Sequence, residues 1–169
     1  MPPARRKTKV VVVMGPMGCG KTTVGRLLAG RLGWRFIEGD TFHPPANVEK
    51  MRSGQPLTDG ERRGWLATLS GMIRQSLSTD SPCVLACSAL KERYREQLGV
   101  EQSRVVTLYL RGSRELLRSR IEARRHPYMD KGLLDSQLDA LEPPQGGIVA
   151  EIARTPEEIV EAVAKQLGK

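Results

Sequence analysis

Two alternating patterns of apolar positions run along the chain. Short continuous runs of aliphatic residues are typical of parallel strands buried on both faces, and the clearest run is the four valines and a methionine at 10–14. Between such runs, apolar residues recur three and four positions apart, as on one face of a helix; the stretch 22–32, which Gly33 ends, is an example. The predicted strands are 10–14, 35–38, 83–87, 104–110 and 148–152, and the predicted helices are 22–32, 44–53, 59–77, 91–98, 113–125, 131–141 and one opened by 155–158.

This alternation of strand and helix indicates the fold class. Helical connections between parallel strands pack back onto the sheet, so five alternations predict an α/β fold of three layers, with a five-stranded parallel sheet flanked by helices. The 169 residues suit one domain with its own core. No run of eighteen apolar residues occurs, and the apolar stretch after the basic start is too short for a signal peptide. We therefore expect a cytoplasmic protein that does not enter a membrane.

The three cysteines, Cys19, Cys83 and Cys87, cannot all pair within one chain, and their spacing is not that of a metal site. Cys83 and Cys87 lie in one predicted strand, which keeps them too far apart to form a disulfide. We expect free thiols, as is usual in a reducing cytosol.

A glycine-rich segment follows the first predicted strand and opens the first predicted helix. Residues 15–22 match G-x-x-x-x-G-K-S/T at every fixed position, in the strand-to-helix context that this motif requires. In such a loop the backbone N–H groups surround phosphates, the lysine reaches the β- and γ-phosphates, and the hydroxyl binds magnesium. The sequence therefore predicts ATP or GTP binding, with Lys21 also catalytic and Thr22 as a Mg²⁺ ligand. The predicted ATP-binding residues are Gly15, Pro16, Met17, Gly18, Cys19, Gly20, Lys21, Thr22 and Thr23.

The formal charge of +8 is compatible with a protein that binds nucleic acid. Aromatic residues make up only 4% of the chain, however, which leaves few rings for stacking on single strands. Six arginines between positions 111 and 125 carry much of the basic excess, and an enzyme that handles phosphate needs such a cluster as well. Charge alone does not decide between these classes.

The second predicted strand ends in Glu38-Gly39-Asp40, at the edge of the sheet where open α/β folds bind ligands. A carboxylate there can orient an attacking hydroxyl and accept its proton, as the catalytic aspartate does in other kinases. Asp40 is therefore the candidate base. The alternative is that Asp40 is a turn residue or a helix cap before the prolines at 44–45.

Several further segments resemble the signature of the gluconate kinases. They are residues 39–51 with 54–59, residues 86–91 with Tyr94 and Arg95, and residues 134–138 with 141–143. The resemblance covers nearly the whole chain, from about residue 10 to the last helix. It implies a P-loop kinase fold, similar to that of shikimate and nucleoside monophosphate kinases, in a single domain 1–169. A substrate-side helical insertion at about 42–79 and a lid at about 120–133 are implied with it.

The resemblance also implies an activity and an acceptor site. The family transfers the γ-phosphoryl group of ATP to the 6-hydroxyl of D-gluconate, and a homodimer is the implied assembly. Gluconate is a carboxylate with five hydroxyls, so cationic and hydrogen-bonding groups suit it better than an apolar wall. The implied acceptor residues are Asp40, His43, Lys50, Arg52, Arg62, Ser88 and Lys91. For the cations at 50, 52 and 62, a solvated helix face is the alternative.

Arg120 and Arg124 lie four positions apart on one predicted helix face. The resembled fold implies that this segment closes over ATP and brings both arginines to the transferring phosphate as catalytic residues; the alternative is that they lie on a surface helix. This lid departs from the family pattern R-x-G-H-F-M, because Pro127 stands where the histidine is expected and His126 precedes it. We therefore assign His126 no inherited role. Cys19 replaces a common serine, and its side chain need not touch phosphate.

Two other functions compete with a gluconate kinase. Shikimate kinases usually show Asp-x-Asp after the second strand and three glycines after the third, whereas this chain has Glu38-Gly39-Asp40 and Cys87-Ser88-Ala89. A nucleotide-dependent nucleic-acid-binding protein would agree with the charge, but the chain has no recognition motif for it. The sequence therefore favours a small-molecule kinase with ATP, Mg²⁺ and gluconate as its ligands, and no nucleic-acid partner.

Overall fold

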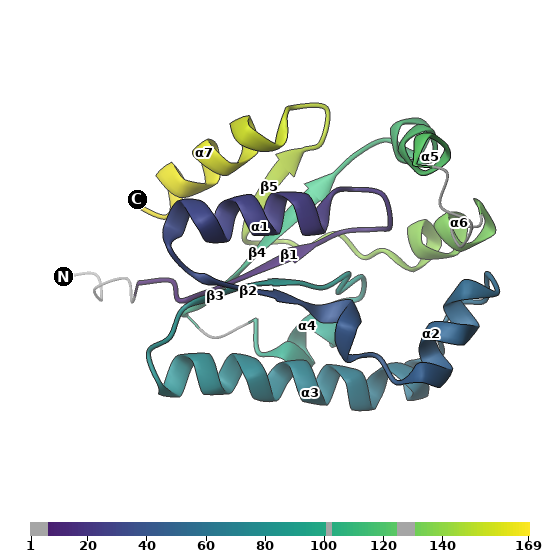
Figure 1. The fold of residues 1–169 in the computed structure, drawn as a ribbon, viewed down its shortest axis with the longest axis horizontal. Coiled ribbons are helices and arrows are strands. Elements are labelled where there is room, and N and C mark those ends of the chain that lie inside the picture. Colours follow the sequence, from purple (N-terminus) through teal and green to yellow (C-terminus); the bar gives the residue numbers. More distant parts are fainter. Residues whose placement is uncertain (1–6, 101–102, 125–130) are drawn as a thin grey trace.

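Within residues 7–100, 103–124 and 131–169, which the computed structural model describes, a parallel sheet of five strands forms the centre of the molecule (Figure 1). Its strand order is β2-β3-β1-β4-β5. The strands are β1 (Val10–Met14), β2 (Arg35–Glu38), β3 (Cys83–Ala86), β4 (Val105–Arg111) and β5 (Ile148–Glu151). The predicted α/β fold with a five-stranded parallel sheet is confirmed.

β1 lies in the middle of the sheet, and all of its residues are fully buried. It pairs in parallel with β3 on one side and with β4 on the other, so that Val13 lies opposite Ala86 and Leu108. Parallel strands bring their carboxyl ends to one edge of the sheet. The glycine-rich segment after β1 therefore emerges beside the segments that follow β2 and β3.

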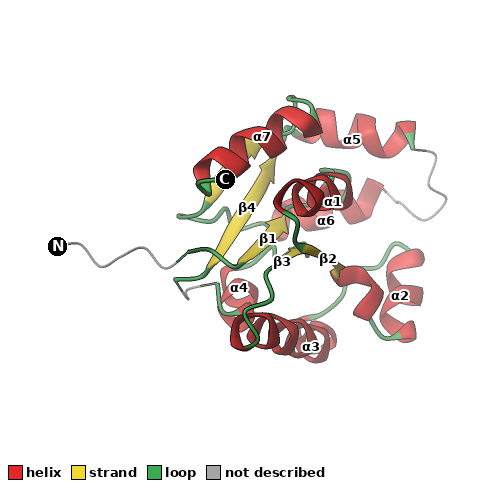
Figure 2. Ribbon diagram, turned by 60° about the vertical axis from the view of Figure 1, so that its left-hand side comes forward, coloured by secondary structure: helices red, strands yellow, loops and turns green. Residues whose placement is uncertain are grey.

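Helices cover both faces of the sheet (Figures 1 and 2). One face is covered by α1 (Lys21–Leu32), α5 (Arg114–Ala123) and α7 (Pro156–Gln166), and the other by α3 (Asp59–Ser78) and α4 (Glu92–Leu98). Val11 and Val13 of β1 pack towards the first group, whereas Val10 and Val12 pack towards the second. A strand buried on both faces explains why its sequence is continuously apolar.

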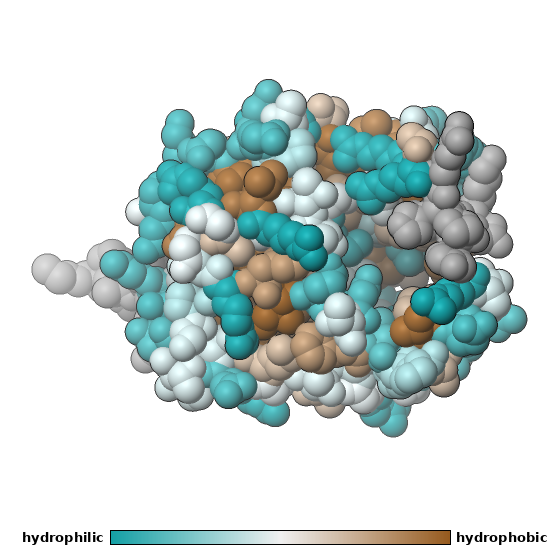
Figure 3. All heavy atoms as spheres, viewed as in Figure 1, coloured by the Kyte–Doolittle hydropathy of each residue, from teal (hydrophilic) through white to brown (hydrophobic). Residues whose placement is uncertain are grey.

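The remaining elements lie beyond the carboxyl edge of the sheet. They are the 3₁₀ helix η1 (Gly39–Phe42), α2 (Pro45–Arg52) and α6 (Lys131–Ala140). Figure 1 places α2 and α6 on opposite sides of this edge, and the space-filling view of the same face is hollowed between their regions (Figure 3). The hollow is at the end of the molecule where the glycine-rich segment emerges.

Side-chain caps fix where several helices begin. Thr58 and Glu61 form a capping box at α3, each side chain bonded to the backbone N–H of the other. Ser113 accepts from the Leu116 N–H at α5, and Thr155 caps α7, at the start predicted for this helix. The observed bounds differ from the predicted ones by at most two residues, within the usual uncertainty at the ends of elements.

The predicted insertion and the predicted lid can each be compared with the observed elements. The range 42–79 contains the end of η1 and all of α2 and α3. The range 120–133 contains the end of α5 and the start of α6, whereas residues 125–130, with His126 and Pro127, lie outside the described residues. The single domain, the insertion and the lid stay predictions.

Cys19, Cys83 and Cys87 are buried free thiols, as predicted. Burial raises the pKa of Cys87 to about 12 and also raises that of Cys83. Both thiols are therefore protonated at neutral pH, and thiols in this form react slowly. In the described part of the chain, no helix combines the length and the apolar character needed to cross a bilayer.

Candidate active site

The glycine-rich loop turns from β1 into α1 around the ammonium group of Lys21. Lys21 Nζ donates to the carbonyl oxygens of Gly15 at 2.9 Å and Pro16 at 3.2 Å. Gly18 and Gly20 have φ angles of +81° and +96°, which glycine adopts without a steric penalty. Because Gly20, the cap residue of α1, has no side chain, the first N–H groups and the positive dipole end of α1 are open to an anion.

Apolar packing supports this loop from the side of the core. Cys19 is 1% exposed and belongs to the cluster between the sheet and α1. Its thiol therefore occupies the core, which explains how a cysteine is accommodated where gluconate kinases commonly have serine. A methyl group at Gly18 would lie 2.9 Å from Ile121 Cγ1, so α5 approaches the loop closely. Both contacts restrict the loop before any ligand binds.

Two carboxylates at the end of β2 lie beside the loop. Glu38 is the last residue of β2, opposite Ala86 of β3, and its Oε2 accepts a hydrogen bond from Thr22 Oγ1. Asp40 follows in η1, where it is exposed and lines the same cavity as Glu38. Glu38 is absent from the predicted site residues, although its place at the carboxyl end of a strand is the signal that indicated Asp40.

A cavity of about 180 Å³ lies between the loop and these carboxylates. From the predicted ATP site it is lined by Met17, Gly18, Gly20, Lys21, Thr22 and Thr23. From the predicted acceptor and lid residues it is lined by Asp40, His43, Arg62, Ser88 and Arg124. The fold thus brings a phosphate-binding loop, a carboxylate and two arginines around one volume, which is an arrangement suited to phosphoryl transfer.

His43 forms a buried wall of this cavity. Its ring stacks on Trp65 with centroids 3.9 Å apart, and Trp65 Nε1 donates to the Gly39 carbonyl at 2.8 Å. The Asn47 amide nitrogen donates to the Glu61 carbonyl at 3.0 Å and lies 3.4 Å from His43 Nδ1. Since that nitrogen is a donor, Nδ1 accepts and the neutral ring carries its proton on Nε2. Burial lowers the pKa of His43, which favours this neutral form.

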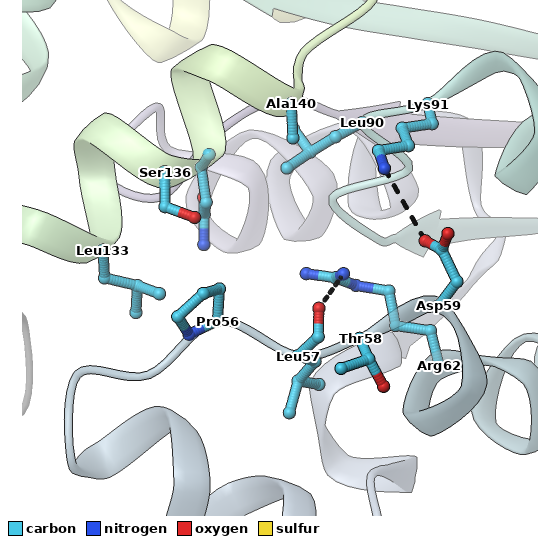
Figure 4. Close-up of a pocket in the computed structure, with 11 residues that line it drawn as sticks. Pro56, Leu57, Thr58, Asp59, Arg62, Leu90, Lys91, Leu133, Ser136 and Ala140 are labelled. Atoms are coloured by element: carbon cyan, nitrogen blue, oxygen red, sulfur yellow. Dashed lines mark hydrogen bonds and ion pairs between the residues drawn. The ribbon is translucent and has the colours of Figure 1, made fainter.

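A second cavity, of about 350 Å³, adjoins the first and shares Leu57, Arg62 and Gln137 with it. Figure 4 shows the Arg62 guanidinium directed into this second cavity from α3, with Lys91 directed towards the neighbouring Asp59. Arg62 Nη1 donates to the Leu57 carbonyl at 2.6 Å and lies 3.4 Å from the Tyr94 hydroxyl. Arg62 therefore lies at the junction of the two cavities, in a fixed orientation.

Asp59 interacts with Lys91, the other cation that lines this second cavity. Its carboxylate accepts from the Tyr94 hydroxyl and from the Arg93 guanidinium, and lies 3.7 Å from Lys91 Nζ. The hydrogen bond from Tyr94, helped by the nearby cations, lowers the pKa of Asp59. An ionised Asp59 thus joins the start of α3 to the start of α4 and positions Lys91 at the cavity wall.

Among the described residues, three of the predicted acceptor and lid residues line neither cavity: Lys50, Arg52 and Arg120. Lys50 Nζ donates to both carboxylate oxygens of Glu61, at 3.0 and 2.9 Å. Arg120 donates to the Ile152 carbonyl just after β5, and Arg52 is exposed at the end of α2. The partners of Lys50 and Arg120 lie on other elements, so their pairing could not be read from helix spacing. The structure does not bring these three side chains to the site.

Gln137 is a further site residue that is absent from the predicted set. Its Oε1 accepts a hydrogen bond of 2.7 Å from the Met17 N–H, across 120 positions of sequence, and its side chain lines both cavities. The one signal for it in the sequence is its place within 134–138, a segment that resembles the gluconate kinases.

Comparison with known proteins agrees with this geometry. A family model described as shikimate kinase matches residues 17–166. Gluconokinase of Gluconobacter oxydans (strain 621H) is 48% identical over 138 residues, which cover 82% of this chain and 78% of the relative. The chain belongs to the gluconokinases, within the wider shikimate kinase family. The predicted family is thereby confirmed, and the shikimate kinase alternative is not favoured.

Solved structures of similar proteins have the same fold. A gluconokinase from Sinorhizobium meliloti 1021 superposes with a TM-score of 0.85 and 38% identity, over 97% of this chain and 94% of that one. A sugar kinase from Janibacter sp. HTCC2649 gives a TM-score of 0.89 and 36% identity, over 95% of both chains. The P-loop kinase fold therefore extends over nearly the whole chain.

Proposed function

We propose that this protein transfers the γ-phosphoryl group of ATP to the 6-hydroxyl of D-gluconate, giving 6-phospho-D-gluconate and ADP. The observation that carries the proposal is the junction of two cavities at Arg62. One cavity is built on the phosphate loop, and the other is lined by cations and polar groups that suit a carboxylate bearing hydroxyls. The gluconokinase names of relatives support this choice of sugar acid.

The phosphates of ATP would lie in the glycine-rich loop, against the open N–H groups of α1 and beside Lys21. Thr22 Oγ1 and the Glu38 carboxylate fit Mg²⁺, because both are oxygen ligands at the mouth of the loop and already bond to each other. When bound, Mg²⁺ neutralises charge on the phosphate oxygens. The hydrogen bond from the Thr22 hydroxyl to Glu38 would then be replaced, because both groups would bind the ion.

Asp40 is the proposed base of the transfer. The 6-oxygen of the sugar acid forms a bond to the γ-phosphorus, the bond from that phosphorus to the β–γ bridging oxygen breaks, and the hydroxyl proton passes to the Asp40 carboxylate. Lys21 and Arg124 would neutralise the charge that spreads over the γ-phosphoryl oxygens. Arg120 could join them only by leaving the Ile152 carbonyl, and Lys50 could reach the acceptor only by leaving Glu61.

The acceptor would lie across the junction of the two cavities. With its 6-hydroxyl at Asp40, its carboxylate would lie towards Arg62 and Lys91, whose charges and donors suit it. The His43 Nε2–H and the Ser88 hydroxyl would donate to hydroxyl oxygens between the two ends. This orientation uses each predicted acceptor residue that lines a cavity.

The deciding experiment measures ADP release in a coupled assay with gluconate, related sugar acids, shikimate or no acceptor. We expect gluconate to raise turnover far above the acceptor-free rate, with 6-phosphogluconate as the product identified by ³¹P NMR. A higher kcat/KM for shikimate or for a nucleoside monophosphate would show that the acceptor is assigned wrongly.

A homodimer in the cytoplasm remains part of the proposal. The family resemblance supports the dimer, and light scattering coupled to size-exclusion chromatography tests it. A mass of about 18.7 kDa in solution would contradict a dimer.

A further inference from the structure

Helix α6 presents one face to the acceptor side of the site. Leu133, Ser136, Gln137 and Ala140 all line the second cavity, at spacings of three and four that belong to one helix face (Figure 4 labels three of them). The rest of α6 is held elsewhere, since Leu134 is fully buried in the core and Asp135 pairs with arginines of α5. The position of the Gln137 backbone is therefore fixed by packing.

The orientation of the Gln137 carboxamide is fixed as well. The Met17 N–H can only donate, so the carboxamide atom that meets it at 2.7 Å is the oxygen, Oε1. The nitrogen, Nε2, is then directed away from Met17, on a side chain that lines both cavities. Among the described residues, no side chain or carbonyl accepts a hydrogen bond from Nε2. A carboxamide held in this way offers two donors to whatever occupies the junction.

The chemistry of the junction indicates which ligand atoms these donors meet. A bound phosphate would already have charged and backbone partners in the loop, namely Lys21 and the N–H groups of α1. The carboxylate end of a sugar acid has Arg62 and Lys91. A neutral amide donor between these two charged regions suits a hydroxyl oxygen, which is uncharged and needs a partner when water is excluded.

We propose that Gln137 determines acceptor specificity: anchored by the Met17 N–H, its Nε2 donates to one hydroxyl oxygen of the sugar acid in the middle of the chain, between C2 and C5. This inference rests on the proposed function. It gives α6 a direct role in acceptor recognition and connects that role to the phosphate loop, because one carboxamide contacts both.

Two substitutions separate the two halves of the carboxamide. Gln137→Met removes both hydrogen bonds at nearly constant length, whereas Gln137→Glu keeps an oxygen for the Met17 N–H and loses the donor. We expect both variants to raise the KM for gluconate about five- to tenfold, the effect of one lost neutral hydrogen bond. The KM for ATP of Gln137→Met should stay within about twofold of wild type. Asp139→Asn, an exposed change on the same helix, is the matched control and should alter neither constant.

A series of deoxygluconates then identifies the hydroxyl. In the wild-type protein, removal of the contacted hydroxyl should lower kcat/KM about five- to tenfold relative to gluconate. In Gln137→Met, the same analogue and gluconate should have nearly equal kcat/KM values. Removal of any other hydroxyl should lower kcat/KM by the same factor in both proteins. This selective pattern cannot come from a merely structural effect of the substitution, because such an effect would act on every analogue equally.

Several outcomes would overturn the inference while leaving the proposed function intact. One is a wild-type protein that phosphorylates gluconate and a Gln137→Met variant with an unchanged KM for it. Another is a Gln137→Glu variant equal to wild type, which would mean that Gln137 acts only by holding the loop. If every deoxy penalty is the same in both proteins, no hydroxyl contacts Gln137. A wild-type protein inactive on gluconate would instead contradict the proposed function.

Discussion

The proposed phosphate side and the proposed acceptor side of this site are built in different ways. The phosphate side consists of consecutive residues and uses mainly backbone groups, with Lys21 bonded to carbonyls five and six positions away. The acceptor side consists of side chains from separate elements, as in the contact between Arg62 of α3 and Tyr94 of α4, 32 positions apart. Gln137 and Arg62 lie where the two sides meet.

This difference predicts how each side responds to substitution. A site made of backbone N–H groups tolerates changed side chains that face the core, as Cys19 illustrates. A site made of charged side chains depends on each ion pair and hydrogen bond that orients them, such as those of Asp59. Changes on the phosphate side should therefore affect turnover with any acceptor, whereas changes on the acceptor side should affect the use of gluconate selectively.

The largest effect is expected at Asp40, the proposed base. Asp40→Asn should lower kcat about 10²- to 10⁴-fold, the usual effect of losing an acid–base group. Acceptor-free ATP hydrolysis should fall less, because no sugar hydroxyl is oriented in that reaction. Equal losses in both assays, restored by raised magnesium, would instead assign Asp40 to the metal site.

On the phosphate side, Lys21→Met should lower turnover about a hundredfold or more, as loss of one preorganised electrostatic partner does. The melting temperature should change little, because the hydrogen bonds that Lys21 makes within the described part of the chain go to its own loop. Activity close to wild type would mean that ATP binds elsewhere.

A substitution of Arg124, the cap residue that follows α5, tests whether this arginine acts in the chemical step. Arg124→Ala should lower kcat about tenfold or more, with a smaller rise in the KM for gluconate, since a contact that strengthens in the transition state appears in kcat. Steady-state kinetics with both substrates varied measures this. A change confined to the KM for ATP would place Arg124 in ground-state nucleotide binding.

On the acceptor side, Asp59→Asn should raise the KM for gluconate about three- to tenfold, because Lys91 and Tyr94 lose the carboxylate that orients them. The KM for ATP should not change. Asp80→Asn is the matched control: Asp80 also pairs with two cations, Lys9 and Arg104, but lines neither cavity. Equal effects of the two variants on gluconate would contradict a local role for Asp59.

The smallest effect concerns pH and stability. Burial lowers the pKa of His43, so the folded protein favours the neutral ring. Below about pH 6.5 the unfolded chain therefore binds more protons than the folded protein. The stability that neutral His43 allows is complete above that pH and is lost as the pH falls. We expect the melting temperature to decrease from pH 7 to pH 5, and to decrease less in His43→Phe, which keeps the stacking on Trp65. Both proteins contain His126, so its effect on the pH dependence is the same in each and cancels in the comparison. Parallel curves would contradict this assignment.

Much of the fold could be predicted from local patterns. The run at 10–14 indicated a central strand because β1 is buried on both faces, and Thr155 indicated the start of α7 because its side chain caps that helix. The phosphate loop was recognisable because its chemistry lies in consecutive residues. The role of Lys50 could not be predicted from a local pattern, because its charge can pair equally well with an anionic ligand or with Glu61.

The sequence by itself determined the order of strands and helices, the phosphate loop and the resemblance to the gluconate kinases, because each of these depends on neighbouring residues. Only the tertiary structure decided which side chains share a cavity. Long polar side chains can reach several partners, and packing of distant elements selects one of them. That packing placed Lys50 on Glu61 and Arg120 on the Ile152 carbonyl, while it brought Glu38 to Thr22 and Gln137 to the Met17 N–H.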